Sequence, residues 1–200
     1  MALSYRLILP AFAALSALAL ASHRGAYSSA ETAGNQAFAA NPHNLGVNVG
    51  TTFCDPMDPN STGLPTVLSG TLNPGVGSGL HLDATQGPVG QFGYFRIGTA
   101  MSDPGVMVGQ GHMCLSIFGG NVYGRYTVPG ILNSIGRFDA NGDLANLAGT
   151  STSGFGFDVP VEVPISGDPS IQAGATWYFQ LIHRENGGTW NYSNGLAYTF

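Results

Sequence analysis

The feature that most constrains the fold of this chain is the spacing of its turns. From Thr51 onward, clusters of Gly, Pro, Asn and Asp separate short runs that are rich in β-branched and aromatic residues. Beyond the N-terminal apolar run, no window of about 11 residues has apolar side chains at the helical period of about 3.6. We therefore expect an all-β protein, an antiparallel β-sandwich of jelly-roll type with about eight to ten strands.

Ten segments have the composition of short strands. They are Thr66–Ser69, Gly79–Asp83, Gln91–Ile97, Met113–Phe118, Val122–Thr127, Ser134–Phe138, Asp143–Leu147, Phe155–Val163, Thr176–Arg184 and Gly195–Phe200. Thr176–Arg184 has apolar side chains on both of its faces, which predicts a central strand. Phe155–Val163 contains Pro160, and because proline cannot donate to a ladder, this strand is expected at an edge or with a bulge.

The C-terminal segment alternates cleanly. Leu196, Tyr198 and Phe200 fall on one face of a predicted strand. The connection back to Thr176–Arg184 is short and Gly-rich, which favours antiparallel pairing of the two strands. We expect Phe200 to be substantially buried near the face of that strand that carries Phe179.

The N-terminus has the features of a secretory signal peptide. Arg6 precedes an apolar run from Leu7 to Leu20, and small residues stand at −3 and −1 of a cleavage point after Ala21. The run is shorter than the roughly 20 residues that span a bilayer. We expect a signal peptide over residues 1–21, a linker or flexible N-terminal arm over 22–50 and a β-sandwich domain over 51–200. The protein is then secreted, extracellular or on the cell surface.

The charge balance is acidic. The chain has no lysine, and its six arginines stand against 11 acidic residues. Removal of residues 1–21 also removes Arg6, which leaves five arginines and 11 acidic residues, a net charge of −6. Such a surface repels nucleic acid and anionic membranes, and we expect neither as a partner and no membrane span.

Two cysteines, Cys54 and Cys114, are present. In an exported protein an even count favours a disulfide, and closing a loop of about 60 residues stabilises the fold by roughly 4 kcal/mol in the chain-entropy model. The alternative is a metal site that uses Cys114 and His112, but two ligands at that spacing do not complete one.

Asp139, Asn141 and Asp143 occupy alternate positions, as the first ligands of a calcium loop do. The match ends there, because Leu144 stands where such a loop has Gly and Thr150 where it has Glu. The Asn-Gly pair is instead a strong hairpin signal. We expect a turn without a required metal, and no cofactor.

No residue set indicates catalysis. The chain has no G-x-S-x-G motif, and both cysteines are expected to be bonded. Asp158 and Glu162 share one face of a predicted strand, about 13 Å apart at about 3.3 Å per residue. Catalytic carboxylate pairs lie about 5 to 9.5 Å apart. We therefore expect no enzyme, with a hydrolase as the less favoured alternative.

Trp190 and Tyr192 lie in a Gly- and Asn-rich stretch, residues 187–194, and are the aromatic residues most expected to face a ligand. Exposed rings would form a sugar-stacking surface, whereas the alternative for any strand aromatic is packing inside the fold.

Several segments together resemble a known domain. They are Cys54, Pro59–Gly63, Gly90–Phe95, Gly111–Leu115, Arg137–Gly142, Ala173–Gln180 and Asn191–Phe200. In this order they resemble an uncharacterised extracellular domain that is common in secreted proteins of planctomycetes and related marine bacteria. The resemblance covers residues 51–200 and implies secretion, a β-rich fold and a Cys54–Cys114 pair. It implies no activity and no catalytic residues.

The leading hypothesis is a secreted, non-catalytic module for binding, adhesion or structure. A carbohydrate-binding module with exposed aromatics and a self-assembling surface or filament subunit are the alternatives. The expected partners are an extracellular glycan, a cell-surface protein or further copies of the chain.

Overall fold

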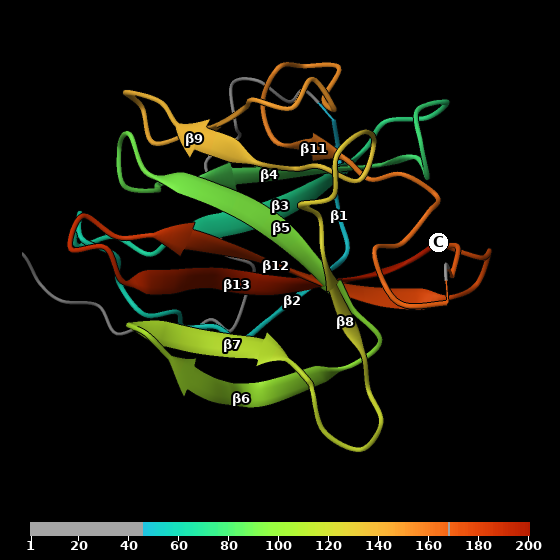
Figure 1. The fold of residues 1–200 in the computed structure, drawn as a ribbon, viewed down its shortest axis with the longest axis horizontal. Helices are drawn as coiled ribbons and strands as arrows, with labels where there is room; N and C mark the ends of the chain where they lie inside the picture. The colour runs from blue at the N-terminus through green and yellow to red at the C-terminus, as the bar shows by residue number, and fades with distance from the viewer. Residues whose placement is uncertain (1–45, 168) are drawn as a thin grey trace, which may run out of the picture. The chain divides into compact units, whose positions relative to one another are not determined.

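The computed structural model describes residues 46–167 and 169–200, which form thirteen β-strands and no helix (Figure 1). The predicted signal peptide over 1–21 lies outside the described residues, as does the predicted arm up to residue 45. All the pairings between strands in the described residues are antiparallel.

The strands form two large sheets and a two-stranded ribbon. The four-stranded sheet has the order β1 (Asn48–Val49), β3 (Val67–Leu72), β4 (Leu80–Thr85) and β11 (Phe157–Asp158). The seven-stranded sheet has the order β10 (Leu144–Asn146), β9 (Gly136–Phe138), β5 (Phe92–Gly98), β12 (Thr176–Arg184), β13 (Trp190–Thr199) and β2 (Thr51–Phe53), with β8 (Tyr123–Arg125) also paired to β5. The ribbon is β6 (Met101–Val108) and β7 (Gly111–Leu115).

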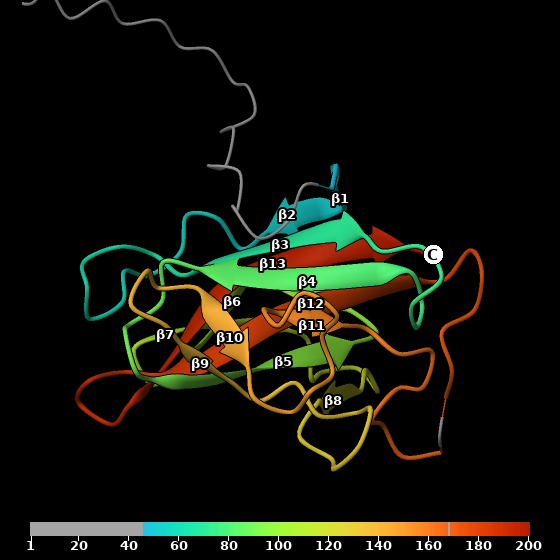
Figure 2. The same ribbon diagram turned by 90° about the horizontal axis from the view of Figure 1, so that it is seen from above.

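The main core lies between the two large sheets, which Figure 2 shows as two layers. Phe95 and Phe179 come from the seven-stranded sheet, whereas Leu82 and Phe157 come from the four-stranded sheet, and all four are fully buried. Burying a side chain of this size contributes about 1.5–3 kcal/mol. Two antiparallel sheets that enclose one apolar layer confirm the predicted β-sandwich.

The ribbon lies against the other face of the seven-stranded sheet. Met113 of β7 packs there on Ile182 and Tyr192. Strand β12 is therefore buried on both faces, as its two-sided apolar pattern predicts. Its bounds are the predicted ones.

Four elements differ from the sequence analysis, and one of them is β2, which no predicted strand covers. Strand β6 was not expected, because Pro104 and Gly105 within it are typical of loops. Strand β1 lies inside the predicted arm and pairs with β3, so the sandwich begins before Thr51. The predicted strand Phe155–Val163 is reduced to β11, which ends two residues before Pro160.

The C-terminal strand is confirmed and is longer than expected. β13 pairs with β12 through the partners Phe179 and Leu196, and with β2 on its other side. Phe200 follows the strand and is half-buried, with its ring centroid 6.4 Å from that of Phe179. The predicted neighbour is correct, although Phe200 is less buried than expected.

Candidate functional site

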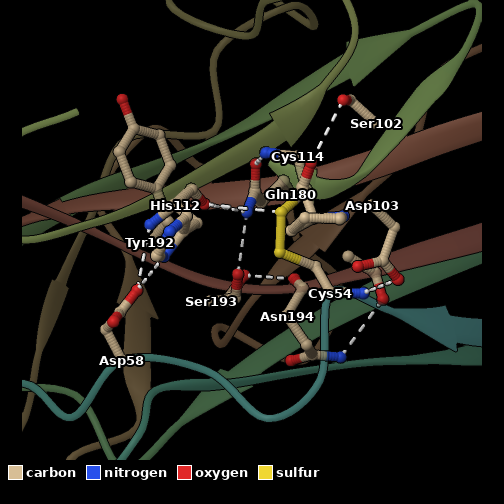
Figure 3. Close-up of a disulfide and its surroundings, with 12 residues drawn as sticks. Cys54, Asp58, Ser102, Asp103, His112, Cys114, Gln180, Tyr192, Ser193 and Asn194 are labelled. Atoms are coloured by element: carbon tan, nitrogen blue, oxygen red, sulfur yellow. Dashed lines mark hydrogen bonds and ion pairs between the residues drawn. A yellow bond between two sulfur atoms is a disulfide. The ribbon is translucent and has the colours of Figure 1, made fainter. Parts of the chain in front are cut away.

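The two cysteines are joined where the ribbon meets the seven-stranded sheet (Figure 3). Cys54 follows β2 and Cys114 lies in β7, with a Cα–Cα distance of 6.2 Å. Phe53 and Leu115 pack around the bond. The predicted pairing is confirmed at disulfide distance, so Cys114 is not available as a ligand in the alternative metal site.

Gln180 fastens the ribbon to the sheet beside this disulfide. Its side chain is fully buried; Oε1 accepts a hydrogen bond from the backbone N–H of Cys114 at 2.9 Å, and Nε2 donates to the carbonyls of His112 and Ser193. Sequence reasoning missed this role, because a polar residue that alternates with apolar ones usually faces water. Nothing in the sequence indicates that β7 covers it.

A small cavity of about 180 Å³ lies next to the disulfide and is lined by Asp58, Asp103, His112 and Ser193 among others. Asp58 Oδ2 is 2.6 Å from His112 Nδ1 and also accepts a hydrogen bond from the His112 backbone N–H. Asp103 Oδ2 accepts from the backbone N–H of Cys54 at 3.0 Å. These bonds attach the segment after Cys54 to the ribbon.

A carboxylate that orients a histidine is half of a nucleophilic apparatus. The serine that lines the same cavity does not supply the rest, because Ser193 Oγ accepts from the N–H of Leu181 and donates to the carbonyl of Asn194. The Asp58–His112 pair therefore fixes the position of a loop.

Asp139, Asn141 and Asp143 form the turn between β9 and β10, which pair directly on either side of it. Asp139 Oδ1 accepts hydrogen bonds from the backbone N–H groups of Asn141 and Asp143 at 2.8 and 3.0 Å. This is an Asx turn closing a hairpin. Across the described residues no group of three or more His, Cys, Asp or Glu side chains is placed to hold a metal ion.

Asp158 and Glu162 line one cavity of about 380 Å³ beside residues 149–152. The estimate of 13 Å along an extended strand does not apply, since β11 ends at Asp158. Asp158 is nevertheless occupied: Oδ1 interacts with His81 and Asn73, and Oδ2 accepts from the backbone N–H of Thr152.

The two candidate aromatic residues belong to β13 rather than to a loop. Tyr192 is 3 % exposed under Met113, so the expectation that its ring faces a ligand is wrong. Trp190 is half-buried, and the Arg184 guanidinium carbon lies 3.7 Å from its ring centroid. Only Trp190 of the pair remains a candidate for ligand contact.

Trp190 belongs to a larger surface, which we call the Arg–aromatic face. In the strand register Phe92 pairs with Arg137, Arg96 with Arg125, and Arg184 with Trp190. Paired residues share a sheet face, as do residues two apart in one strand. The Arg–aromatic face thus consists of Phe92, Tyr94, Arg96, Tyr123, Arg125, Arg137, Arg184 and Trp190, on the side of the seven-stranded sheet away from the main core.

Most of these side chains reach the surface. Phe92 is 49 % exposed, the arginines at 125, 137 and 184 are exposed, and Tyr94, Tyr123 and Trp190 are half-buried. The rings of Tyr94 and Trp190 meet edge to face at 6.5 Å. The ribbon of β6 and β7 covers the neighbouring part of the seven-stranded sheet, so the Arg–aromatic face lies next to the ribbon.

The ribbon itself presents apolar side chains. Val106, Met107 and Val108 are consecutive and all exposed, and β6 pairs only with β7 among the described strands. Its second edge is thus available for pairing. An exposed apolar edge strand is a template for another strand.

The chain has no recognisable relative in three comparisons: no family model, no curated protein and no solved structure matches it. The resemblance to the planctomycete extracellular domain therefore stays a prediction. Within the part of the chain that the structure describes, no helix is long and apolar enough to cross a membrane.

Proposed function

We propose that this chain is an exported, non-catalytic module that binds carbohydrate on the Arg–aromatic face. The observation that carries the proposal is the gathering of Phe92, Tyr94 and Trp190 with arginines on an accessible sheet face. Aromatic rings stack on the apolar faces of sugars, and arginines bind the groups around them. A flat or shallow sheet face accommodates an extended polymer better than a small molecule.

Export is supported by the N-terminal apolar run after Arg6 and by the Cys54–Cys114 pair, since disulfides persist in oxidising compartments. A non-catalytic role is supported by the hydrogen bonds that engage one candidate catalytic side chain in each cavity. Asp158 is bonded to His81, and Ser193 is bonded to backbone groups.

The test is affinity electrophoresis of the purified chain in gels that contain single polysaccharides, neutral and acidic. We expect retardation by at least one polymer and a weaker effect for Phe92→Ala. Phe118→Ala is the matched control, because Phe118 is 61 % exposed in the loop after β7 and lies outside the face. Failure of every polymer to retard the protein contradicts the proposal.

A second candidate function is self-association through β6. The edge residues Val106–Val108 carry no charge, and an antiparallel pair of β6 strands about a twofold axis satisfies the backbone groups of both copies. Light scattering after size exclusion tests this. A dimer that Met107→Lys dissociates supports the interface, provided that Leu147→Lys, which changes an equally exposed loop residue, leaves the dimer intact.

A further inference from the structure

Within the described residues of this acidic chain, every arginine lies in one sheet. The four arginines in the described residues, Arg96, Arg125, Arg137 and Arg184, all lie in the seven-stranded sheet, and the register places all four on the Arg–aromatic face. No Asp or Glu occurs in any of the seven strands of that sheet. In a chain of net charge −5, this face is where an anion is attracted.

These arginines are not neutralised by acidic side chains. Among the described residues, the cation in every ion pair is a histidine. Structural arginines usually pair with carboxylates, especially when they are buried. Their charge is therefore available to a ligand.

Arg96 is the clearest case. It is 3 % exposed, with its guanidinium carbon 4.1 Å from the ring centroid of Tyr123. Nη1 donates to the sulfur of Met113, a weak acceptor, and Nε has no hydrogen-bond partner in the structure. The side chains of Tyr123 and Tyr192 also interact with Arg96, but none of these neighbours carries a negative charge. A buried cation without an anionic partner is costly in the free protein, and a nearby anion lowers that cost.

The geometry points to a polysaccharide that carries carboxylate or sulfate groups as the ligand of this face. This inference rests on the proposed function and names its substrate class. Arg125 and Arg184 stand at the surface. Arg184 Nη1 donates to the carbonyl of Gly188, and the remaining donors of both guanidinium groups bind such anions through charge-assisted hydrogen bonds. Tyr94 and Trp190 contact the sugar rings between the anionic groups. The positive charge of the buried Arg96 also attracts those anionic groups.

Nucleic acid is the less fitting polyanion. It carries a phosphate at every nucleotide, and proteins that bind it neutralise several phosphates with basic side chains. This chain has six arginines and no lysine, against 11 acidic residues. The density of charge on the face fits a polymer whose anionic groups are separated by apolar ring faces.

The experiment compares dextran, dextran sulfate, polygalacturonate and single-stranded DNA in one affinity-electrophoresis series at physiological salt. Dextran sulfate and dextran share a backbone and differ in sulfate, while polygalacturonate supplies carboxylates instead. Arg125→Gln and Arg184→Gln are the test variants. Gln172→Glu is the control: it makes the same change in net charge at an exposed position before β12, at the opposite end of that strand from Arg184.

We expect at least one acidic polysaccharide to bind tenfold or more tightly than dextran. Each test variant should lose about tenfold, the value of one charge-assisted hydrogen bond, and Gln172→Glu should bind as the wild type does. Dextran binding as strong as that of both acidic polymers overturns the inference but leaves the proposed function intact. Binding to none of the polymers overturns both. Tighter binding of DNA than of either acidic polysaccharide, or equal losses in control and test variants, also overturns the inference.

Discussion

His81 and Asp158 are paired across β4 and β11 at one edge of the four-stranded sheet, where both side chains are buried and His81 Nδ1 lies only 2.6 Å from Asp158 Oδ1. Asp83 Oδ1 lies 3.3 Å from the other ring nitrogen. Burial lowers the pKa of His81, but the hydrogen bonds with Asp158 and Asp83 outweigh it and raise the pKa to about 9. Burial raises the pKa of Asp158, and the bonds from His81, Thr152 and Asn73 lower it to about 2.

These shifts predict how stability depends on pH. The folded His81 holds its proton more tightly than the unfolded residue, whose pKa is 6.5, so its contribution is complete below about pH 6.5 and is lost as the pH rises through about 9. The contribution of Asp158 is present above about pH 3.8 and is lost as the pH falls through about 2. The pair should stabilise the fold most between about pH 4 and 6.5.

Urea denaturation between pH 6 and 9.5 measures the alkaline limb. We expect the free energy of unfolding to fall by an amount on the order of 3 kcal/mol at most, because the His81 pKa moves from 6.5 to about 9. Asp158→Asn should flatten this decline. The control variant His112→Gln removes a half-exposed histidine, and its stability should decline with pH as that of the wild type does. If Asp158→Asn leaves the decline unchanged, the decline does not come from the His81–Asp158 pair.

Loss of the disulfide should destabilise the chain strongly. Mass spectrometry of the non-reduced protein should show no free thiol, and Cys54→Ser with Cys114→Ser should lower the free energy of unfolding by roughly 4 kcal/mol, the model value for a loop of about 60 residues. Two alkylated cysteines in the non-reduced protein would exclude the bond.

The hairpin at Asp139 should depend on its side-chain acceptor and not on calcium. Asp139→Ala removes the Asx turn and should cost about 1 kcal/mol, whereas Asp139→Asn keeps an acceptor oxygen at the same place and should cost less. Millimolar calcium should leave the melting temperature of the wild type unchanged. A rise of several degrees that Asp143→Ala abolishes would reveal a metal site.

The C-terminal aromatics should contribute according to their burial. Phe179→Ala opens a cavity in the main core and should cost about 3–5 kcal/mol. Phe200→Ala removes a half-buried ring and should cost about half as much. Deletion of residues 195–200 removes half of β13, which lies between β12 and β2, and should abolish soluble export. Export of that truncated chain with the wild-type melting temperature would show the strand to be dispensable.

Local patterns predicted the elements whose neighbours lie close in sequence. The bounds of β12 followed from its run of aromatic and apolar residues, and the hairpin of β9 and β10 followed from the Asn-Gly pair. The antiparallel partnership of β12 and β13 followed from their short connection. In each case the physical cause lies within a few consecutive residues. It is the strand-like composition for β12, the backbone freedom of the turn residues for the hairpin, and the short loop for the pairing of β12 with β13.

The same reasoning failed where a distant segment covers a residue. Alternation gives β12 two faces, but it does not say that β7 lies on the second one. Gln180 is therefore buried against Cys114 although it is polar, and Tyr192 lies under Met113 although its stretch of sequence is rich in Gly and Asn. Strand β6 was missed for the same reason, since Pro104 and Gly105 are tolerated in a ribbon that pairs along one edge.

The sequence by itself determined that this chain is a β-protein whose two cysteines pair and whose charge balance is acidic. Only the tertiary structure decided where the charge lies. Arg96, Arg125, Arg137 and Arg184 are far apart in the chain, and the register of four antiparallel pairings brings them to one face. The composition gives the number of charged residues but not their positions in space. A strand pattern shows which residues of one strand share a face, but not which face of the sheet that is. The Arg–aromatic face forms because the hydrogen-bonded register between strands places the arginines of different strands on the same side of the sheet.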